Sequence, residues 1–194
     1  TMYNMIEAKH HDWMGLTTLC ISIVYLLQAV VVLRRQATNP KLLAQTVLTS
    51  VVLLIIGTSI QFIGFTTVIF WSLEGVILVW CALRWNLRYV YWAAAGLFLA
   101  AVTKLAALEG AFGTSPITSF VLLLNYRGLT YVTLAATIAG SAVLLTSAAH
   151  REIRYLTAAF YVACCTIIFT FLTVEVNDFF GRSLALAPGS ITLP

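Results

Sequence analysis

The sequence predicts an all-α membrane protein: a polytopic bundle of six transmembrane helices with both termini on the outer side, periplasmic or extracellular. Of its 194 residues, 61% are hydrophobic and 9% are charged, whereas soluble domains are about 45–50% apolar and about 25% charged. Six apolar stretches are long enough to cross a hydrocarbon core of about 30 Å at about 1.5 Å per residue. So few polar side chains cannot cover such a core, and lipid must therefore be the solvent.

The six expected spans lie within one integral membrane domain, 1–194. The first stops at the basic pair Arg34 and Arg35, and the second carries a small face at Gly57, Thr58 and Ser59 that suits close helix packing. The third ends at Arg84, and the fifth is rich in Ala, Thr, Gly and Ser. In chain order the spans are 13–33, 42–63, 66–83, 89–108, 129–148 and 155–177.

Two segments lie outside the spans. The longer connection, 109–128, holds an apolar run at 120–124 that is too short to span, so we expect a re-entrant piece, an interfacial piece or an early start to the next helix. The tail, 181–194, is polar and is expected at the surface. Because the chain begins at Thr1, either an initiator methionine has been removed or the sequence is a piece of a longer protein.

The basic residues predict the orientation. Cytoplasmic loops of membrane proteins carry an excess of Lys and Arg. The loops after the first, third and fifth spans hold seven such residues and the opposite side holds three, so the odd loops are expected in the cytoplasm. The seven are Arg34, Arg35, Lys41, Arg84, Arg88, Arg151 and Arg154; the three are Lys9, Arg127 and Arg182.

One carboxylate, Glu74, lies deep in the third span. An ionisable group near the bilayer centre costs about 2.5–3.5 kcal/mol on insertion scales, so a partner, a proton or a function must offset it. Glu74 should lie about 12 Å below the outer surface and Lys104, in the fourth span, about 6 Å below it. We therefore expect an intramembrane polar cluster of Glu74, Lys104 and Glu175 that opens outward.

The same residues also have a structural interpretation. A buried pair of Glu74 and Lys104 can simply lock the third and fourth spans in register. Lys104 can instead extend its ammonium to the interface and touch nothing, and Glu175 can be an interfacial residue at the end of the sixth span.

No pattern in the sequence indicates catalysis, a metal or a cofactor. The four cysteines lie in apolar runs without ligand spacing, and His10 and His11 would point about 100° apart on a helix. Nucleophile, zinc and phosphate-loop motifs are missing, so no enzyme activity is expected. Asn125 and Arg127 could contact an anion or a lipid headgroup on the outer face, or could form a helix-entry turn.

Three stretches resemble a known family, and the match covers roughly residues 66 to 178. They are FWSLEGVILVWCALRWNLRYVYWAAAGLFLAAVTKLAAL, LLLNYRGLTYVTLAA and FTFLTVEVNDFF, and they are similar to domain of unknown function 2339, a family of bacterial multi-pass membrane proteins. The resemblance implies a location in the bacterial inner (plasma) membrane and no established activity. The positions that carry it are Trp71, Leu73, Glu74, Gly75, Lys104, Leu124, Asn125 and Arg127.

Three functions fit these residues. The first is a structural or accessory subunit or scaffold of a membrane complex, which meets a protein partner or a second copy through small-residue helix faces. The second is a small-molecule or ion transporter that uses Glu74 paired with Lys104. The third is an outer-leaflet enzyme on a lipid-linked substrate, which requires Glu175, Asp178 and Arg127 to converge. The expected partners are the lipid bilayer and a protein. No nucleic acid is expected as a partner, because basic and aromatic residues do not alternate in the sequence.

Overall fold

The chain is helical throughout its described part. The computed structural model describes residues 13, 15–25, 27, 28, 31, 40–111, 125–146 and 151–185. They form six helices: a first helix, Gly15–Tyr25, followed by α2 (Pro40–Gln61), α3 (Phe65–Trp85), α4 (Arg88–Ala111), α5 (Tyr126–Thr146) and α6 (Arg151–Ala185). The all-α prediction is therefore confirmed.

Four of these helices are long and apolar enough to cross a membrane. They are α3, α4, α5 and the Ile153–Gly181 part of α6, and they correspond to the last four predicted spans. The described apolar parts of the first two helices, Gly15–Tyr25 and Gln45–Gln61, are shorter. At 35 residues, α6 is about 52 Å long by its helical rise, which is longer than a bilayer core of about 30 Å.

Two tight turns connect α2 to α3 and α3 to α4. Gly64 has a φ of 69°, a conformation that costs glycine little because it lacks a Cβ. Asn86 closes α3 in the left-handed region, with a φ of 53°, and the Leu87 N–H donates to the Ala82 carbonyl at 3.0 Å. This bond is the C-terminal cap of a Schellman motif, and Asn is among the residues that tolerate it.

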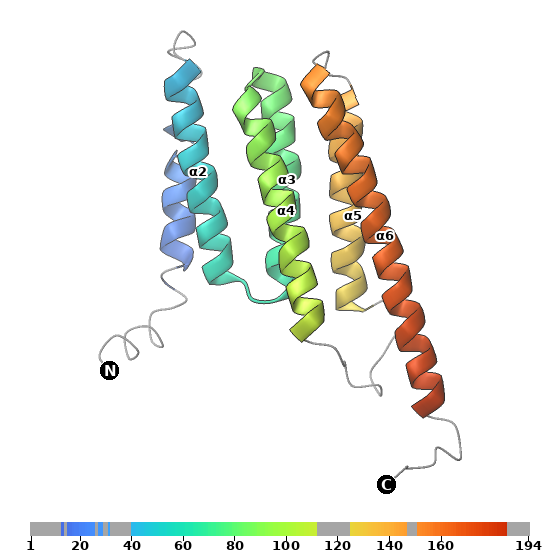
Figure 1. The fold of residues 1–194 in the computed structure, drawn as a ribbon. Coiled ribbons are helices and arrows are strands. Elements are labelled where there is room, and N and C mark those ends of the chain that lie inside the picture. The colour runs from blue at the N-terminus through green and yellow to red at the C-terminus, as the bar shows by residue number, and fades with distance from the viewer. Residues whose placement is uncertain are drawn as a thin grey trace.

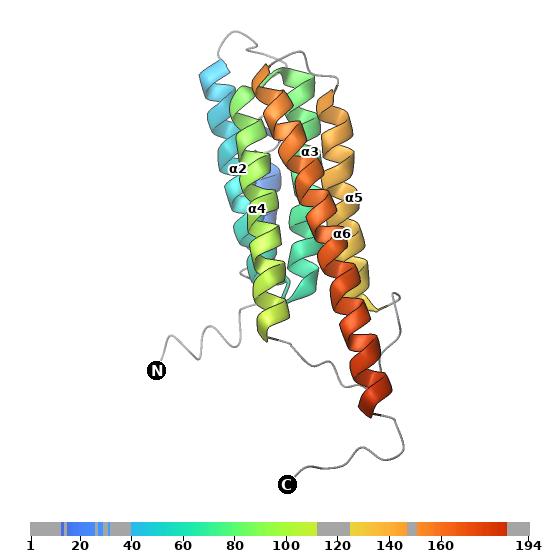
Figure 2. The same ribbon diagram turned by 45° about the vertical axis from the view of Figure 1, so that its right-hand side comes forward.

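The centre of the bundle is α3. It packs mainly against α4 and α5, and α5 packs against α6 (Figures 1 and 2). The rings of Phe98 on α4 and Phe160 on α6 meet edge to face, with centroids 5.3 Å apart, so α4 also contacts α6. At the starts of α3 and α5, Phe65 and Tyr126 are in ring contact, and Thr66 is hydrogen-bonded to Tyr126. These two helices therefore run parallel, with α4 and α6 antiparallel to them.

The core follows helical stripes. On α3, Val68, Ser72, Gly75, Val79 and Ala82 are buried, at alternating steps of four and three residues that place them on one face. Similar stripes occur on α4, α5 and α6. The buried apolar residues are Val90, Tyr91, Ala94, Leu97, Phe98, Ala101 and Leu105 on α4, Tyr131, Leu134, Ala135, Ile138, Ala142 and Leu145 on α5, and Ile153, Leu156, Phe160, Cys164, Ile167 and Phe171 on α6.

The first helix and α2 form a separate pair, and α2 packs against α3. Ser22 donates to the Ser50 carbonyl at 3.0 Å and Ser50 donates to the Ser22 carbonyl at 3.1 Å. A Cβ added to Gly57 would lie 3.0 Å from the Leu19 side chain, so the small face predicted for this span does meet a neighbouring helix. Small residues of this kind let two backbones approach closely in a membrane.

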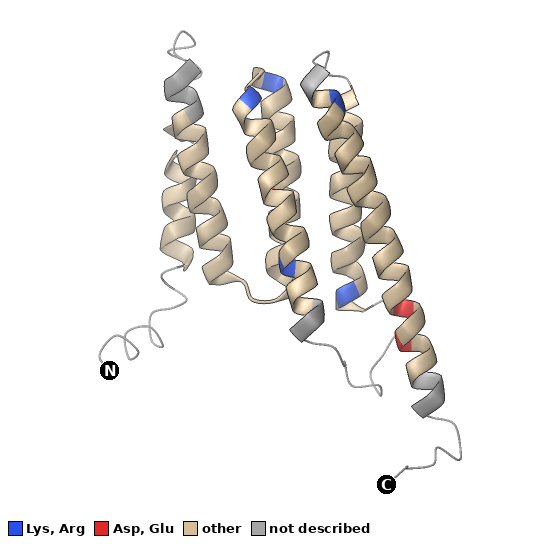
Figure 3. Ribbon diagram, in the orientation of Figure 1, with Lys and Arg blue, Asp and Glu red and all other residues tan. Residues whose placement is uncertain are grey.

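Charged residues gather at the two ends of the bundle (Figure 3). Arg84 and Arg88 flank the α3–α4 turn, and Arg154 lies in the first turns of α6. The acidic residues Glu175 and Asp178 lie toward the opposite end of α6. One end of the helices is therefore rich in arginine, and the other carries two carboxylates with Arg127 beside them.

Candidate functional site

Glu74 lies in the middle part of α3. It lies nine residues after the start of α3 at Phe65, which is about 14 Å along the helix axis. Its side chain is buried, with 7% of its surface exposed. It is neighboured on α3 by Trp71, one turn earlier, and by Gly75.

Glu74 faces α2. The Thr58 hydroxyl interacts with the Glu74 carboxylate, and the Trp71 indole N–H donates to the same Thr58 oxygen at 3.2 Å. Trp71 and Glu74 are three residues apart and so lie on neighbouring parts of one helix face. Together, Thr58, Trp71 and Glu74 form a small polar site in the α2–α3 interface, which we call the Glu74 site.

One oxygen of the Glu74 site has no partner. Glu74 Oε2 is buried and accepts no hydrogen bond from the described residues. Thr58 can give it little, because its single proton is also directed to the main-chain carbonyls of Leu54 and Ile55, at 2.9 and 3.1 Å. A buried polar atom without a partner costs about 1–3 kcal/mol. Chemically, the site can hold a proton or accept one further donor or small cation.

Lys104 is not part of this site. Gly75 of α3 lies against Phe98 of α4, which places Lys104 about 7.5 Å further along the axis than Glu74. The direction in which Lys104 points around α4 separates the two residues further. The buried face of α4 runs through Ala101 and Leu105, whereas Lys104 is exposed beside Thr103. The structure shows no ion pair between Glu74 and Lys104, although both residues are described.

A second polar group joins the start of α5 to the far part of α6. Asn125 Nδ2 donates to Glu175 Oε1 at 3.0 Å, and Arg127 forms a 2.7 Å salt bridge with Asp178. The Asn125 side-chain oxygen also accepts from the Gly128 N–H at 2.5 Å, which is the hydrogen bond of a helix N-cap. We call these four side chains the α5–α6 clasp.

Glu175 belongs to the clasp and lies far from Glu74. Asn125 precedes α5, whose first residue, Tyr126, meets Phe65 at the start of α3. Glu175 therefore lies at the height where α3 begins, about 14 Å from Glu74 along the helix axis. The expected cluster of Glu74, Lys104 and Glu175 is not formed, because the three side chains differ in height and in the helix face that carries them.

The clasp also changes the interpretation of Asn125 and Arg127. The helix-entry alternative agrees with the N-cap at Asn125. The anion or headgroup contact is disfavoured, because Arg127 already binds the Asp178 carboxylate and Glu175 adds a second acidic group nearby. One guanidinium beside two carboxylates does not attract an anion.

Sequence reasoning missed Thr58 and Trp71 as neighbours of Glu74. A three-residue spacing puts Trp71 and Glu74 on one face, and this signal was available in the sequence. The contact with Thr58 depends on how α2 and α3 are turned toward each other, which the sequence does not state. His10, His11, the run 120–124 and the tail from residue 186 lie outside the described residues.

Comparisons with protein-family models, with curated proteins and with solved structures gave no match to this chain. The resemblance to domain of unknown function 2339 therefore stays a prediction.

Proposed function

We propose that this chain is a six-span integral membrane subunit, with both termini outside, that acts as a structural or accessory part of a larger complex in the bacterial inner membrane. The observation that carries the proposal is the clasp. Its charged and polar side chains are used to join α5 to α6, through Asn125–Glu175 and Arg127–Asp178. Glu175 exposes 3% of its surface, so it is a packing group that a substrate cannot reach.

The surface of α4 supports a protein partner. Lys104 is exposed within the apolar length of this helix and has no ion-pair partner among the described residues. Leu99 and Thr103, on the same side of the helix, are exposed as well. A lysine at this depth is costly unless it reaches the interface or meets an opposite charge. A carboxylate on a partner helix would satisfy it.

Site-specific photo-cross-linking tests this proposal. A photoreactive residue at Thr103 should give one discrete cross-linked product in native membranes, either a second copy of this chain or another membrane protein. The product should persist with Lys104→Arg, which keeps the charge, and weaken strongly with Lys104→Met. A product of equal intensity in both variants, or none in the wild type, would rule out a partner that binds this region through the charge of Lys104.

A second candidate is a cation- or proton-linked carrier. It is favoured by one observation, the buried Glu74 Oε2 without a partner. In this form the hypothesis replaces Lys104 by Thr58 as the neighbour of the carboxylate, with Trp71 donating a hydrogen bond to Thr58. Intramembrane carboxylates of this kind serve as ion and proton sites in transporters.

Thermal unfolding in liposomes separates the two candidates. A carrier should be stabilised by one cation, or by a change of pH, in the wild type but not in Glu74→Gln. Glu175→Gln is the matched control, because it removes the charge of a carboxylate that already has a partner. If no cation or pH step distinguishes wild type from Glu74→Gln, the carrier hypothesis fails and the subunit hypothesis stands alone.

The outer-leaflet enzyme has the weakest support. Arg127 and Asp178 do meet, as that hypothesis requires, and Glu175 lies close by on the same turn of α6. Arg127 and Asp178 nevertheless pair with each other, and Glu175 accepts a hydrogen bond from Asn125. A catalytic acid must reach the substrate within hydrogen-bond distance, and the burial of Glu175 prevents this.

A further inference from the structure

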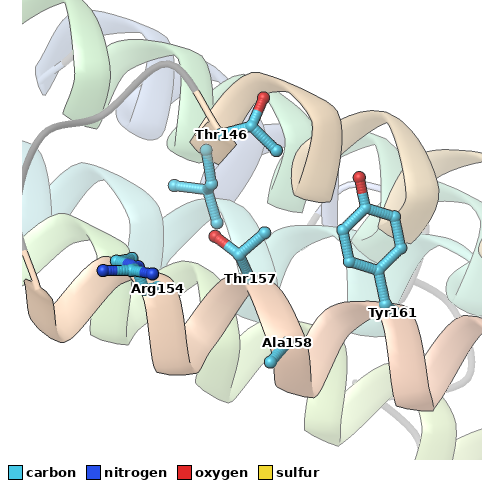
Figure 4. A pocket seen from close by; sticks show the side chains of 6 residues that line it. Thr146, Arg154, Thr157, Ala158 and Tyr161 are labelled. Carbon is cyan, nitrogen blue, oxygen red and sulfur yellow. The ribbon is translucent and has the colours of Figure 1, made fainter.

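A pocket opens where α5 ends and α6 begins (Figure 4). Its volume is about 350 Å³, which is within the range of about 300–1,000 Å³ that is usual for small-ligand sites. Four of its lining residues come from α6 at spacings of three and four, so they share one face of that helix. The lining residues are Leu145, Thr146, Arg154, Thr157, Ala158 and Tyr161.

The pocket offers hydrogen-bond donors and a positive charge. Figure 4 shows Thr157 and Tyr161 rising from α6 toward the end of α5. Arg154 is exposed, and among the described residues neither its guanidinium nor the Tyr161 hydroxyl has a bonding partner. The two threonines use their protons on main-chain carbonyls, Thr146 on Val143 at 2.6 Å and Thr157 on Ile153 at 2.8 Å.

These groups select an anion, and the geometry suits phosphate. A guanidinium presents two parallel N–H groups to phosphate oxygens, and this pairing is stronger than a neutral hydrogen bond. The phenol of Tyr161 can donate one more hydrogen bond. Of the described residues that line the pocket, none is acidic, in contrast to the clasp at the other end of α6, where Arg127 is already neutralised by Asp178.

The surroundings point to a lipid as the source of the phosphate. The pocket lies at the arginine-rich end of the bundle, level with the last residue of α5, Thr146, where lipid headgroups meet the apolar part of a membrane. Leu145 and Ala158 give it apolar walls. Below it, the same face of α6 exposes apolar residues that include Ile168 and Leu172, along which an acyl chain can lie.

We propose that this pocket binds the phosphate of an anionic phospholipid in the leaflet at the arginine-rich end, with Arg154 and Tyr161 as the binding residues. The headgroup phosphate lies against the Arg154 guanidinium, and the Tyr161 hydroxyl, two helical turns further along α6, donates to the glycerol ester. The glycerol and the first part of a chain lie against Leu145 and Ala158. Basic pockets between helices near the cytoplasmic face are known binding sites for anionic headgroups. The inference does not depend on which proposed function is correct.

Native mass spectrometry and thermal unfolding of the full chain in detergent test this inference. Phosphatidylglycerol, phosphatidylcholine and inorganic phosphate are the three probes. We expect phosphatidylglycerol to bind as one retained lipid and to raise the unfolding midpoint, with phosphatidylcholine much weaker. Loss of a charge-assisted bond in Arg154→Gln should weaken binding by about tenfold or more. Loss of a neutral bond in Tyr161→Phe should weaken it by about threefold to tenfold.

Arg84→Gln is the matched control, because Arg84 is an exposed arginine at the same end of the bundle and does not line the pocket. It should leave the affinity unchanged. If Arg84→Gln and Arg154→Gln lose binding equally, surface charge is responsible and the site does not exist. Equal stabilisation by inorganic phosphate would overturn the lipid assignment. If Arg154→Gln fails to fold without lipid, Tyr161→Phe decides, and wild-type affinity in that variant would overturn the proposal.

Discussion

Replacing Gly75 with alanine should disrupt the contact between α3 and α4. A Cβ at this position would lie 2.6 Å from Phe98 Cζ and 2.9 Å from both Cε atoms, whereas carbon atoms in favourable contact are about 3.5–4.0 Å apart. The ring must therefore move by about 1 Å. It cannot move freely, because its other side meets Phe160, with centroids 5.3 Å apart.

The expected cost is that of an overpacked core, about 1–3 kcal/mol. This corresponds to a shift of about 5- to 150-fold in the unfolding equilibrium, since about 1.4 kcal/mol is a factor of ten. Phe98→Leu removes the ring that causes the clash. The double variant Gly75→Ala, Phe98→Leu should therefore be more stable than the sum of the two single changes predicts, by about 0.5–3 kcal/mol of coupling.

Reversible unfolding in mixed micelles, followed by tryptophan fluorescence, measures these differences. Gly96→Ala on α4 is the control, because an added Cβ there meets nothing within 4 Å. It should be neutral or slightly stabilising, since alanine is the better helix former. If Gly75→Ala is as stable as Gly96→Ala, or if Phe98→Leu gives no rescue, then α3 and α4 do not approach each other as described.

Two further predictions follow from the placement of charges and turns. In double-mutant cycles, Arg127→Met with Asp178→Leu should show a coupling of about 0.2–1 kcal/mol, whereas Glu74→Gln with Lys104→Met should be additive within about 0.5 kcal/mol because the two side chains do not meet. A cysteine at Asn86, in the turn beside Arg84 and Arg88, should react with an impermeant thiol reagent only from the cytoplasmic side; labelling from outside would reverse the proposed orientation.

Composition and hydropathy were enough to predict the helices. The expected span 66–83 became α3, Phe65–Trp85, and 129–148 became α5, Tyr126–Thr146, because long apolar runs in this composition have no other regular structure available. The ends were less predictable. The helix α6 runs to Ala185, beyond the expected 177, because the end of a helix is not fixed by the end of an apolar run.

The pairing of polar residues was harder to predict because it depends on the helix face. Lys104 has the right charge to pair with Glu74, but it lies at a different height and Ala101 and Leu105 occupy the inward face of α4. The spacing of the apolar residues on α4 could have predicted that Lys104 points away from Glu74. The depth of Lys104 along the helix could not. Glu175 is the opposite case: it continues the buried stripe after Phe171, so its burial could have been read from the spacing.

The two buried glutamates should respond to the same substitution with opposite signs. Glu175→Leu removes the acceptor of Asn125 Nδ2 and should destabilise the protein by about 1–3 kcal/mol, because a donor in the clasp loses its bond. Glu74→Leu removes a carboxyl whose Oε2 has no partner. This change leaves no donor without an acceptor, since the Thr58 hydroxyl still donates to the Leu54 and Ile55 carbonyls.

Glu74→Leu should therefore be neutral or stabilising, by up to about 1–3 kcal/mol. The measurement is the free energy of unfolding of both variants in the same mixed micelles. A stabilised Glu74→Leu would mean that the wild type keeps a costly carboxylate inside the α2–α3 interface for a reason other than folding, and a bound proton or cation would be that reason. Equal destabilisation by both substitutions would instead make Glu74 a packing residue like Glu175, and it would remove the support for a carrier.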